Sequence, residues 1–345
     1  MCTGVRFTDD KGNLYFGRNL DWIFDFGQNV VISPTNYSHT YEYLGPMKNK
    51  YALIGMGIVS DGIPLYFDCG NTEGLACGGL NFPGYADYAD PAGIDGKTNI
   101  ASYEFPLWVC SQFKTVDEVE AVLKDTVINS KPVNDKFQAS MLHWLIADSE
   151  RSIVVEYTKD GMQIFHDEVD VLANQPGFNW HTENLRNYMN VSNAWIDNVT
   201  WREHTMAPFG SGVSMRGIPG DYYSPSRFVR AAYLNANYPV QSGENANVGR
   251  LFHILGGVSM IKGAAKMDDK GDFEYTTYTG CFSPYYMNYY YTTYDDPAIR
   301  YVSLQDYDAD GDAVIEVLDK DAKYGRISAD PDKLRPQRYS NVQPA

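Results

Sequence analysis

The sequence has few positively charged residues. It contains 28 Lys and Arg against 44 Asp and Glu, which gives a formal net charge of −16 at neutral pH. This balance excludes nonspecific binding to nucleic acid or to an anionic membrane surface, because both partners require a positive field. A small anionic substrate is compatible with it only if arginines are placed locally around that substrate.

Long apolar runs and paired cysteines are also missing. No apolar run approaches the roughly 20 residues of a membrane-spanning helix, and no apolar h-region of a secretory signal follows Met1. The five cysteines are scattered and form no C-x-x-C pair, which argues against a disulfide framework and against a zinc site. We therefore expect a soluble cytoplasmic protein whose thiols stay reduced.

Aromatic residues and alternating segments, by contrast, are abundant. The 27 tyrosines and 16 phenylalanines favour β-structure, and runs such as 275–278 and 289–294 alternate like strands. A capping-box pattern from Thr115 to Glu118 begins one helix, and further helices are expected at 226–234 and 247–255. The order of strands, helices, strands, helices and strands predicts one α+β domain over residues 1–345, with stacked sheets between helical layers.

The least regular stretch runs over residues about 184–220 and is rich in Asn, Trp, Met and Gly. It is either a disordered loop or an arm that docks on another subunit. Because long loops in compact domains are usually functional, we favour the arm.

Cys2 stands directly behind the initiator methionine. Removal of Met1 would leave one residue with both a thiol and a free α-amine, whose ordinary pKa values are about 8.5 and about 7.7–8. Near neutral pH the amine can then take the proton of the thiol, which is the logic of N-terminal nucleophile hydrolases. Taken alone, a cysteine at this position could equally be an accident.

The segment after Cys2 predicts a β-hairpin. Val5–Thr8 alternates like a strand, residues 9–13 have turn chemistry, and Leu14–Arg18 reads as the returning strand. The hairpin would bring Arg18 and Asp21 beside Cys2. An arginine there lowers the pKa of a thiol, and an aspartate can accept a hydrogen bond from the α-ammonium. As an isolated pair the two would be read as a surface salt bridge.

Three more polar residues come from distant segments. Asn81 ends the glycine-rich run 74–84, and Asn174 lies in a turn before Pro176, so each could aim an amide donor inward. Arg227 stands in the first turn of a predicted helix, for which Ser224 or Ser226 could be the N-cap. A cation there is unfavourable for the helix dipole, which indicates that another partner holds Arg227.

These residues occur in motifs that resemble the choloylglycine hydrolase family, which comprises conjugated bile salt hydrolases and penicillin V acylases. The motifs are Met1-Cys2-Thr3, Tyr15-Phe16-Gly17-Arg18-Asn19-Leu20-Asp21-Trp22, the segment 79–88 and Ser226-Arg227-Phe228-Val229-Arg230. Segments 140–148 and 291–295 are similar as well. The resemblance thus covers nearly the whole chain, and the motifs in this order are specific although each alone is weak.

The resemblance implies a four-layer αββα sandwich of the N-terminal nucleophile type, with two mostly antiparallel sheets, assembled as a homotetramer without metal or cofactor. It implies that Met1 is removed and that Cys2 is nucleophile and, through its amine, base. Arg18 and Asp21 would orient and polarise Cys2, Asn81 and Asn174 would serve the oxyanion hole, and Arg227 would complete the cluster. Arg18 and Arg227 are also the candidate partners for an anionic end of the substrate.

The implied reaction is hydrolysis of glycine- or taurine-conjugated bile acids through a thioester. Asn81 is typical of the bile salt branch, whereas the penicillin V branch has tyrosine there. Two departures from the family pattern are Ala173, where threonine is common, and Trp22, where tyrosine is frequent. The apolar substrate pocket is expected to include Leu20, Trp22, Phe24, Phe26, Phe67 and Met141. The alternatives are a penicillin V or N-acyl-homoserine-lactone acylase and, from another class, a non-catalytic interaction protein.

Two features resemble other sites. Asp306–Gly311 begins like a calcium-binding EF-hand loop, but the twelfth position is Val317 and no entering helix precedes it. We expect a turn between two strands. His143 and His253 stand in apolar contexts that we interpret as helical, and we expect both to be structural.

Overall fold

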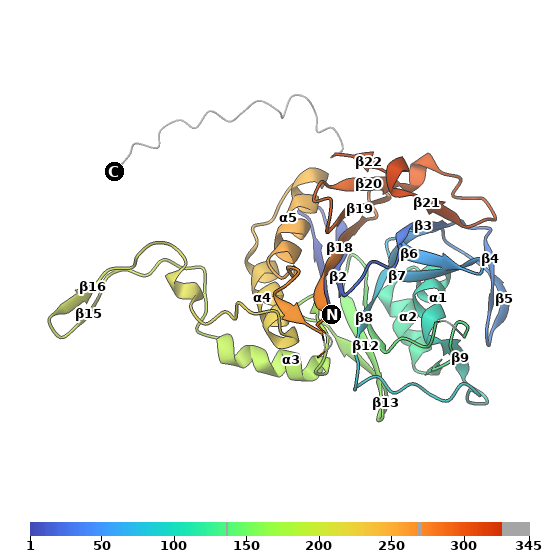
Figure 1. Cartoon of the computed structure of the whole chain (residues 1–345), viewed down its shortest axis with the longest axis horizontal. Coiled ribbons are helices and arrows are strands. Elements are labelled where there is room, and N and C mark those ends of the chain that lie inside the picture. Colours follow the sequence, from blue (N-terminus) through green and yellow to red (C-terminus); the bar gives the residue numbers. More distant parts are fainter. Residues whose placement is uncertain (136, 268, 270, 326–345) are drawn as a thin grey trace.

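The computed structural model describes residues 1–135, 137–267, 269 and 271–325 and shows two large sheets packed face to face between helices (Figure 1). Every pairing within the two large sheets is antiparallel. The predicted α+β class and the αββα sandwich are confirmed.

The first sheet carries the N-terminal strand near its edge. Its order is β14 (Val171–Leu172), β1 (Cys2–Thr8), β2 (Leu14–Trp22), β18 (Phe273–Ser283), β19 (Asn288–Thr293), β20 (Arg300–Ser303) and β22 (Lys323–Tyr324), with β17 (Ala265–Lys266) paired to β18. The predicted hairpin is β1 and β2, in a register that pairs Cys2 with Leu20 and Gly4 with Arg18.

The second sheet is built from the middle of the chain. Its order is β13 (Gly161–His166), β12 (Ser152–Thr158), β11 (Leu142–Ala147), β8 (Ala76–Asn81), β7 (Ile63–Asn71), β6 (Leu53–Ser60), β3 (Asn29–Ser33) and β21 (Ile315–Val317). Three small pairs complete the strands: β4 (Ser38–Tyr41) with β5 (Gly45–Lys48), β9 (Thr98–Ala101) with β10 (Thr126–Asn129), and β15 (Val199–Trp201) with β16 (His204–Met206).

Helices cover the outer face of each sheet (Figure 1). α4 (Ser224–Asn237) and α5 (Glu244–Gly256) pack on the first sheet, and α1 (Phe105–Gln112) and α2 (Val116–Leu123) lie over the second. α3 (Phe178–Asn184) contacts α4. On α5 the buried positions Val248, Leu251 and Leu255 recur at helical spacing and enter the larger core, as expected for an amphipathic surface helix.

Gly17 lets α5 approach the first sheet closely. A Cβ atom on this residue of β2 would lie 2.2 Å from the carbonyl oxygen of Gly280 and 2.5 Å from Leu251 Cδ2. Neither distance is possible between real atoms, so a larger residue would push the strand or the helix away. The glycine therefore fixes the position of its neighbour Arg18.

The N-cap of α2 and the turn at residues 306–311 were both predicted from the sequence. Thr115 is the N-cap of α2 and accepts from the Glu118 backbone N–H at 3.2 Å. The Asp306–Gly311 segment is a turn between β20 and β21. Both predictions are confirmed.

Two others were wrong. His143 lies on strand β11 and not in a helix, because this central strand is buried on both faces and its continuous apolar run mimics a buried helix. Helix α4 begins at Ser224 with Tyr223 as N-cap and has no side-chain cap. The Ser224 hydroxyl instead accepts from the Asn174 backbone N–H, and the Ser226 hydroxyl donates to Asp221.

The segment 184–220 extends away from the body and carries the β15–β16 hairpin (Figure 1). Its apolar side chains are exposed, among them Trp195, Trp201 and Phe209. Within the described ranges, none of the helices combines the length and apolar character that crossing a membrane requires.

Candidate active site

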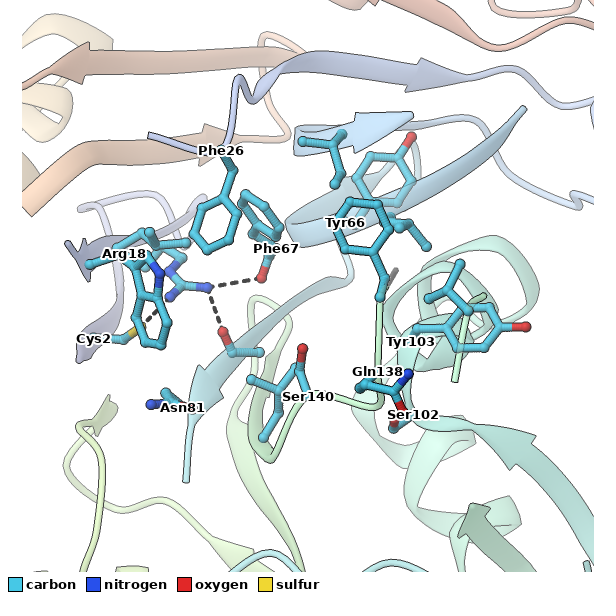
Figure 2. A pocket seen from close by; sticks show the side chains of 18 of the residues that line it. Cys2, Arg18, Phe26, Tyr66, Phe67, Asn81, Ser102, Tyr103, Gln138 and Ser140 are labelled. Carbon is cyan, nitrogen blue, oxygen red and sulfur yellow. Dashed lines mark hydrogen bonds between the residues drawn. The ribbon is translucent and has the colours of Figure 1, made fainter. Parts of the chain in front are cut away.

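Cys2 lies buried at the start of β1, and its thiol faces Arg18. Arg18 Nη2 donates to Cys2 Sγ at 2.6 Å, while Arg18 Nη1 donates to the carbonyl oxygens of Phe67, at 3.0 Å, and Gly79 (Figure 2). These carbonyls belong to β7 and β8, so the guanidinium of the first sheet is anchored in the second. A fixed cation at this distance favours the thiolate form of a cysteine.

The Arg18 guanidinium is buried and remains charged. Burial opposes its charge, but the nearby Cys2, Tyr278 and Asp68 more than offset that effect, so the pKa of Arg18 is raised above its ordinary value. Asp68 on β7 accepts hydrogen bonds from Tyr278 Oη at 2.5 Å and Tyr289 Oη at 2.6 Å. Burial raises the pKa of the Asp68 carboxyl, and Arg18 lowers it in part.

Asp21 is buried on β2, and only one of its two carboxylate oxygens has a hydrogen-bond partner among the described residues. Its Oδ1 accepts from Thr276 Oγ1 at 2.6 Å, while Oδ2 has no hydrogen-bond partner among the described residues and lies 3.8 Å from Arg227 Nη1. An unpartnered carboxylate oxygen in a buried position is costly. Asp21 therefore has acceptor capacity available for a new donor.

Asn174 joins the separate parts of the cluster. Its Oδ1 accepts from the Cys2 backbone N–H and from Arg227 Nη2, both at 2.7 Å, and its Nδ2 donates to the carbonyl oxygen of Asn81 at 2.6 Å. Two donors on one side and an acceptor on the other fix the orientation of the amide. One N–H of Nδ2 is used by Asn81, and an amide has a second.

Arg227 has the partners that its place in a first helical turn suggested. It donates to the carbonyl oxygens of Cys2 and, at 2.9 Å, Tyr222, and to Thr3 Oγ1 at 2.6 Å. Burial lowers the pKa of the Arg227 guanidinium, partly countered by Asp21. Arg227 thus ties α4 to the backbone of β1.

Met1 is attached to the nitrogen of Cys2 and lies beside Asp21 and Glu274. Its ammonium pairs with the Glu274 carboxylate and donates to the Asp21 carbonyl oxygen at 2.6 Å, and its own carbonyl accepts from the Asp21 N–H at 2.7 Å. Burial lowers the pKa of the Met1 ammonium. While Met1 is attached, the Cys2 nitrogen is a peptide N–H and has no basic lone pair. Removal of Met1 stays a prediction.

An apolar cavity of about 250 Å³ opens beside the thiol. Figure 2 shows Cys2 and Arg18 at one end and Tyr103 and Ser102 at the other. Of the predicted site residues, those that line the cavity are Cys2, Arg18, Asp21, Asn81, Leu20, Trp22, Phe26 and Phe67. Asn174 and Arg227 are not among the lining residues, and they contact the backbone of Cys2.

Two predicted pocket residues lie outside the cavity lining. Phe24 is 49% exposed and packs its ring against Trp22 and Phe26, and Met141 is 50% exposed. The neighbours of Met141, Ser140 and Leu142, line the cavity instead. Successive side chains in extended backbone point to opposite sides, so Met141 points away.

The sequence did not point to most of the apolar lining. These residues are Ile58, Leu65, Tyr66, Tyr103, Val133, Phe137 and Leu142, and the polar Gln138 was missed as well. The strand pattern around Phe67 could have indicated its neighbours, but no periodicity in the sequence would place residues 133, 137, 138 and 140 at the cavity. Asp68 was also missed, because no local pattern marks it.

The arrangement can perform covalent acyl transfer. A thiol beside a fixed guanidinium can serve as a nucleophile, and this one opens on an apolar cavity that can hold an acyl group. Among the described residues, no group of three or more His, Cys, Asp or Glu side chains could hold a metal ion.

Comparison with known proteins agrees with this chemistry. The family model of linear amide C–N hydrolases, choloylglycine hydrolase family, matches residues 2–316. A bile salt hydrolase/transferase of Bifidobacterium longum is 52% identical over 318 residues, covering 92% of this chain and 99% of the relative. A conjugated bile acid hydrolase of Lactobacillus acidophilus is 48% identical over 308 residues, covering 89% and 97%.

Solved structures show the same fold. The C2A variant of a conjugated bile acid hydrolase from Clostridium perfringens superposes with a TM-score of 0.87 at 32% identity, covering 95% of this chain and all of that one. A penicillin V acylase from Agrobacterium tumefaciens shares the fold with a TM-score of 0.73 at 18% identity, covering 94% and 98%. The chain therefore belongs to the choloylglycine hydrolase family of linear amide C–N hydrolases.

Proposed function

We propose that this protein hydrolyses the amide bond that joins a bile acid to glycine or taurine. The observation that carries the proposal is the Cys2 thiol, 2.6 Å from Arg18 Nη2, at the polar end of an apolar cavity. The relatives named above act on bile salts or conjugated bile acids by their names, and Asn81 is the residue typical of that branch.

Removal of Met1 frees the α-amine of Cys2. The new ammonium keeps the Asn174 Oδ1 acceptor, 2.7 Å from the Cys2 nitrogen, and gains Asp21 Oδ2 as an acceptor. As a free amine, it takes the thiol proton directly or through a water. Arg18 stabilises the resulting thiolate.

The thiolate attacks the amide carbonyl carbon of the substrate, and the C–S bond forms as the carbonyl oxygen becomes an oxyanion. Asn81 and the second N–H of Asn174 Nδ2 serve this oxyanion, and such a donor is worth about 2.7–4 kcal/mol in comparable sites. The C–N bond then breaks, and the α-ammonium gives its proton to the departing glycine or taurine nitrogen. A thioester remains on Cys2.

Water completes the reaction. The α-amine accepts a proton from the water that attacks the thioester carbonyl carbon. The C–S bond then breaks, which restores the Cys2 thiolate and releases the free bile acid as the second product. The steroid part of the acyl group is held by the apolar lining. Of the two arginines expected to hold an anionic end, Arg18 lines the cavity and Arg227 does not.

Three hydrolysis assays on the mature chain test the proposal, with glycocholate, taurocholate and penicillin V as substrates. We expect bile salts to be preferred and the Cys2→Ala variant to be inactive on all three. Preferred turnover of penicillin V would refute the substrate assignment, and activity surviving in Cys2→Ala would refute the mechanism. Intact-mass measurement should show a chain that begins at Cys2.

The proposal includes a cytoplasmic homotetramer of one-domain subunits. The five free thiols suit a reducing compartment, and the projecting segment 184–220 exposes apolar side chains such as Trp201 and Phe209, which is typical of an interaction surface. Light scattering should give four subunits, and Trp201→Ser together with Phe209→Ser should lower that number. A monomeric wild type would contradict this part.

A further inference from the structure

Asp68 is a buried carboxylate that links the two large sheets beside Arg18. It stands on β7 of the second sheet and is 1% exposed. Its Oδ1 accepts from Tyr289 Oη at 2.6 Å and its Oδ2 from Tyr278 Oη at 2.5 Å, and both tyrosines belong to the first sheet. Each carboxylate oxygen thus has a donor of its own, and hydrogen bonds of this kind favour the ionised form.

Strand pairing places this carboxylate next to the anchors of the Arg18 guanidinium. Arg18 Nη1 donates to the carbonyl oxygen of Phe67, the residue before Asp68, and to that of Gly79. In the register of β7 with β8, the partner of Asp68 is Gly78, the neighbour of Gly79. Asp68 is therefore adjacent to both points at which Arg18 is held in the second sheet.

Gly280 makes room for one of the two tyrosine hydroxyls on the side of the first sheet. Gly280 on β18 pairs with Arg18 on β2, and a Cβ atom on this glycine would lie 2.1 Å from Tyr289 Oη. Side chains of directly paired residues share one face of a sheet. The hydroxyl that holds Asp68 therefore lies on the same face of the first sheet as the Arg18 side chain.

Asp68 supplies a permanent negative charge near Arg18. The charges of the two residues stabilise each other, although they share no hydrogen bond among the described residues. Tyr278 and Tyr289 stay neutral, because burial and the Asp68 charge raise the pKa of both hydroxyls well above its ordinary value. The sulfur of Cys2, by contrast, is negative only as a thiolate and is neutral in the thioester of the proposed reaction.

We propose that Asp68 is a positioning residue that acts through Arg18, because it balances the guanidinium charge whenever the Cys2 sulfur is neutral. The inference rests on the thioester step of the proposed function. A buried cation without a counter-charge is strongly unfavourable. Without Asp68 the thiolate would be stabilised relative to the thioester, since Arg18 would lose its permanent anion, and the attack on the substrate would be slower.

Asp68→Asn removes the charge and keeps the hydrogen bonds. The amide oxygen accepts from one tyrosine, and the amide nitrogen donates to the hydroxyl oxygen of the other. Thioester formation in a single turnover of glycocholate should slow by about 10-fold or more. Thioester hydrolysis should be unchanged or faster, because Arg18 then stabilises the departing thiolate more strongly. Intact-mass measurement of quenched samples follows both steps, and a displaced nucleophile would slow both.

A double-mutant cycle in urea tests the charge pair without any substrate. Asp68→Asn should lower the urea midpoint of unfolding when Arg18 is present, but not in the Arg18→Met background, where the buried carboxylate has lost its cation. Glu244→Gln is the matched control, because Glu244 at the start of α5 is also a buried carboxylate that accepts from a tyrosine, Tyr15 Oη at 2.6 Å. It should lower the midpoint equally in both backgrounds.

Tyr289→Phe removes one hydrogen bond and leaves the charge. It should lower the urea midpoint without changing the ratio of the rates of thioester formation and hydrolysis. An Asp68→Asn chain that folds only in the Arg18→Met background would support the inference as well.

Equal losses for Asp68→Asn in the two backgrounds, or equal slowing of thioester formation and hydrolysis, would overturn the inference. A wild type that forms no thioester from bile salts, while the urea cycle still couples Asp68 to Arg18, would instead refute the proposed function.

Discussion

The two ends of the cavity are assembled in opposite ways. At the polar end Cys2, Arg18 and Asp21 all come from the β1–β2 hairpin, and strand pairing alone brings them together. At the apolar end the lining comes from β6, β7, the 3-10 helix Ser102–Glu104 and residues 133, 137, 138, 140 and 142, which meet only in the folded chain. The difference teaches that the nearness of Arg18 and Asp21 to Cys2 is encoded locally, whereas the shape of the cavity is a property of the packed fold.

The strongest test of the polar end is removal of the nucleophile. Cys2→Ala should lower kcat by at least about 10⁴-fold, because the remaining donors cannot form an acyl-enzyme. Burst and steady-state assays with glycocholate measure this. Cys281→Ala removes another buried thiol of the first sheet and serves as the control; an equal loss there would mean that the effect is structural.

A substitution at Arg18 tests whether the polar end of the cavity depends on its anchoring in the second sheet. Arg18→Met should lower kcat by about 10²- to 10³-fold, since the thiolate loses its cation. It should also lower the free energy of unfolding by about 1–3 kcal/mol, because the carbonyls of Phe67 and Gly79 lose their donor. Urea titration measures the second effect, with exposed Arg186→Met as the control. Full activity in Arg18→Met would contradict the assigned role.

His181, behind the polar end, gives a pH-dependent test. Its pKa is lowered by burial to about 4, whereas an unfolded histidine has about 6.5. Between these values the unfolded chain binds a proton that the folded chain does not. This contribution to stability is therefore fully present above about pH 6.5 and is lost as the pH falls to about 4. The loss amounts to about 3 kcal/mol.

Urea titrations at several pH values in that range give the free energy of unfolding as a function of pH. The slope of this free energy against pH should be smaller for His181→Gln than for the wild type. The Gln amide can still donate to the Asn174 carbonyl, so the variant isolates the titration. Identical slopes in the two proteins would show that His181 does not titrate in this range.

Substitutions at the apolar end of the cavity should change KM more than kcat. Ile58→Ala should raise KM for bile salts by about 5- to 30-fold with little change in kcat, as expected for about 1–2 kcal/mol of lost apolar contact. Phe24→Ala, outside the cavity lining, should change KM less than about twofold. A larger effect at Phe24 than at Ile58 would mean that the substrate binds outside this cavity.

The position of Arg18 and Asp21 beside Cys2 could be predicted because the hairpin has a strong local pattern, whereas Asn81 and Asn174 were assigned to the site through the family resemblance. Alternation and turn chemistry set the β1–β2 register and hence the nearness of Arg18 to Cys2, and the dipole argument indicated that Arg227 needed a partner. Helix caps were less predictable. Ser224 looks like an N-cap by residue type, but its hydroxyl is used by Asn174, which is distant in sequence.

His143 marks the limit of such reasoning most clearly. His143 is buried, as its apolar neighbours suggested, but the same run suggested a helix, since a strand buried on both faces loses its alternation. Nothing in the sequence pairs His143 with Glu156 or with the Ala173 carbonyl. The pairing of β11 with β12 places His143 beside Glu156. Ala173 follows β14 of the first sheet, so its carbonyl reaches His143 only because the two sheets pack together.

By itself the sequence determined the β1–β2 hairpin and the alternation of sheets with helices, because periodicity and turn chemistry act over a few residues. The αββα class and the role expected of Cys2 came from the motifs shared with the family. The tertiary structure alone decided the network of Asp68 with Tyr278 and Tyr289, the reach of Arg18 into the second sheet, and the cavity walls. These depend on two sheets meeting face to face, and the side chains that meet there are far apart along the chain. Residue spacing carries no information about which of them will touch.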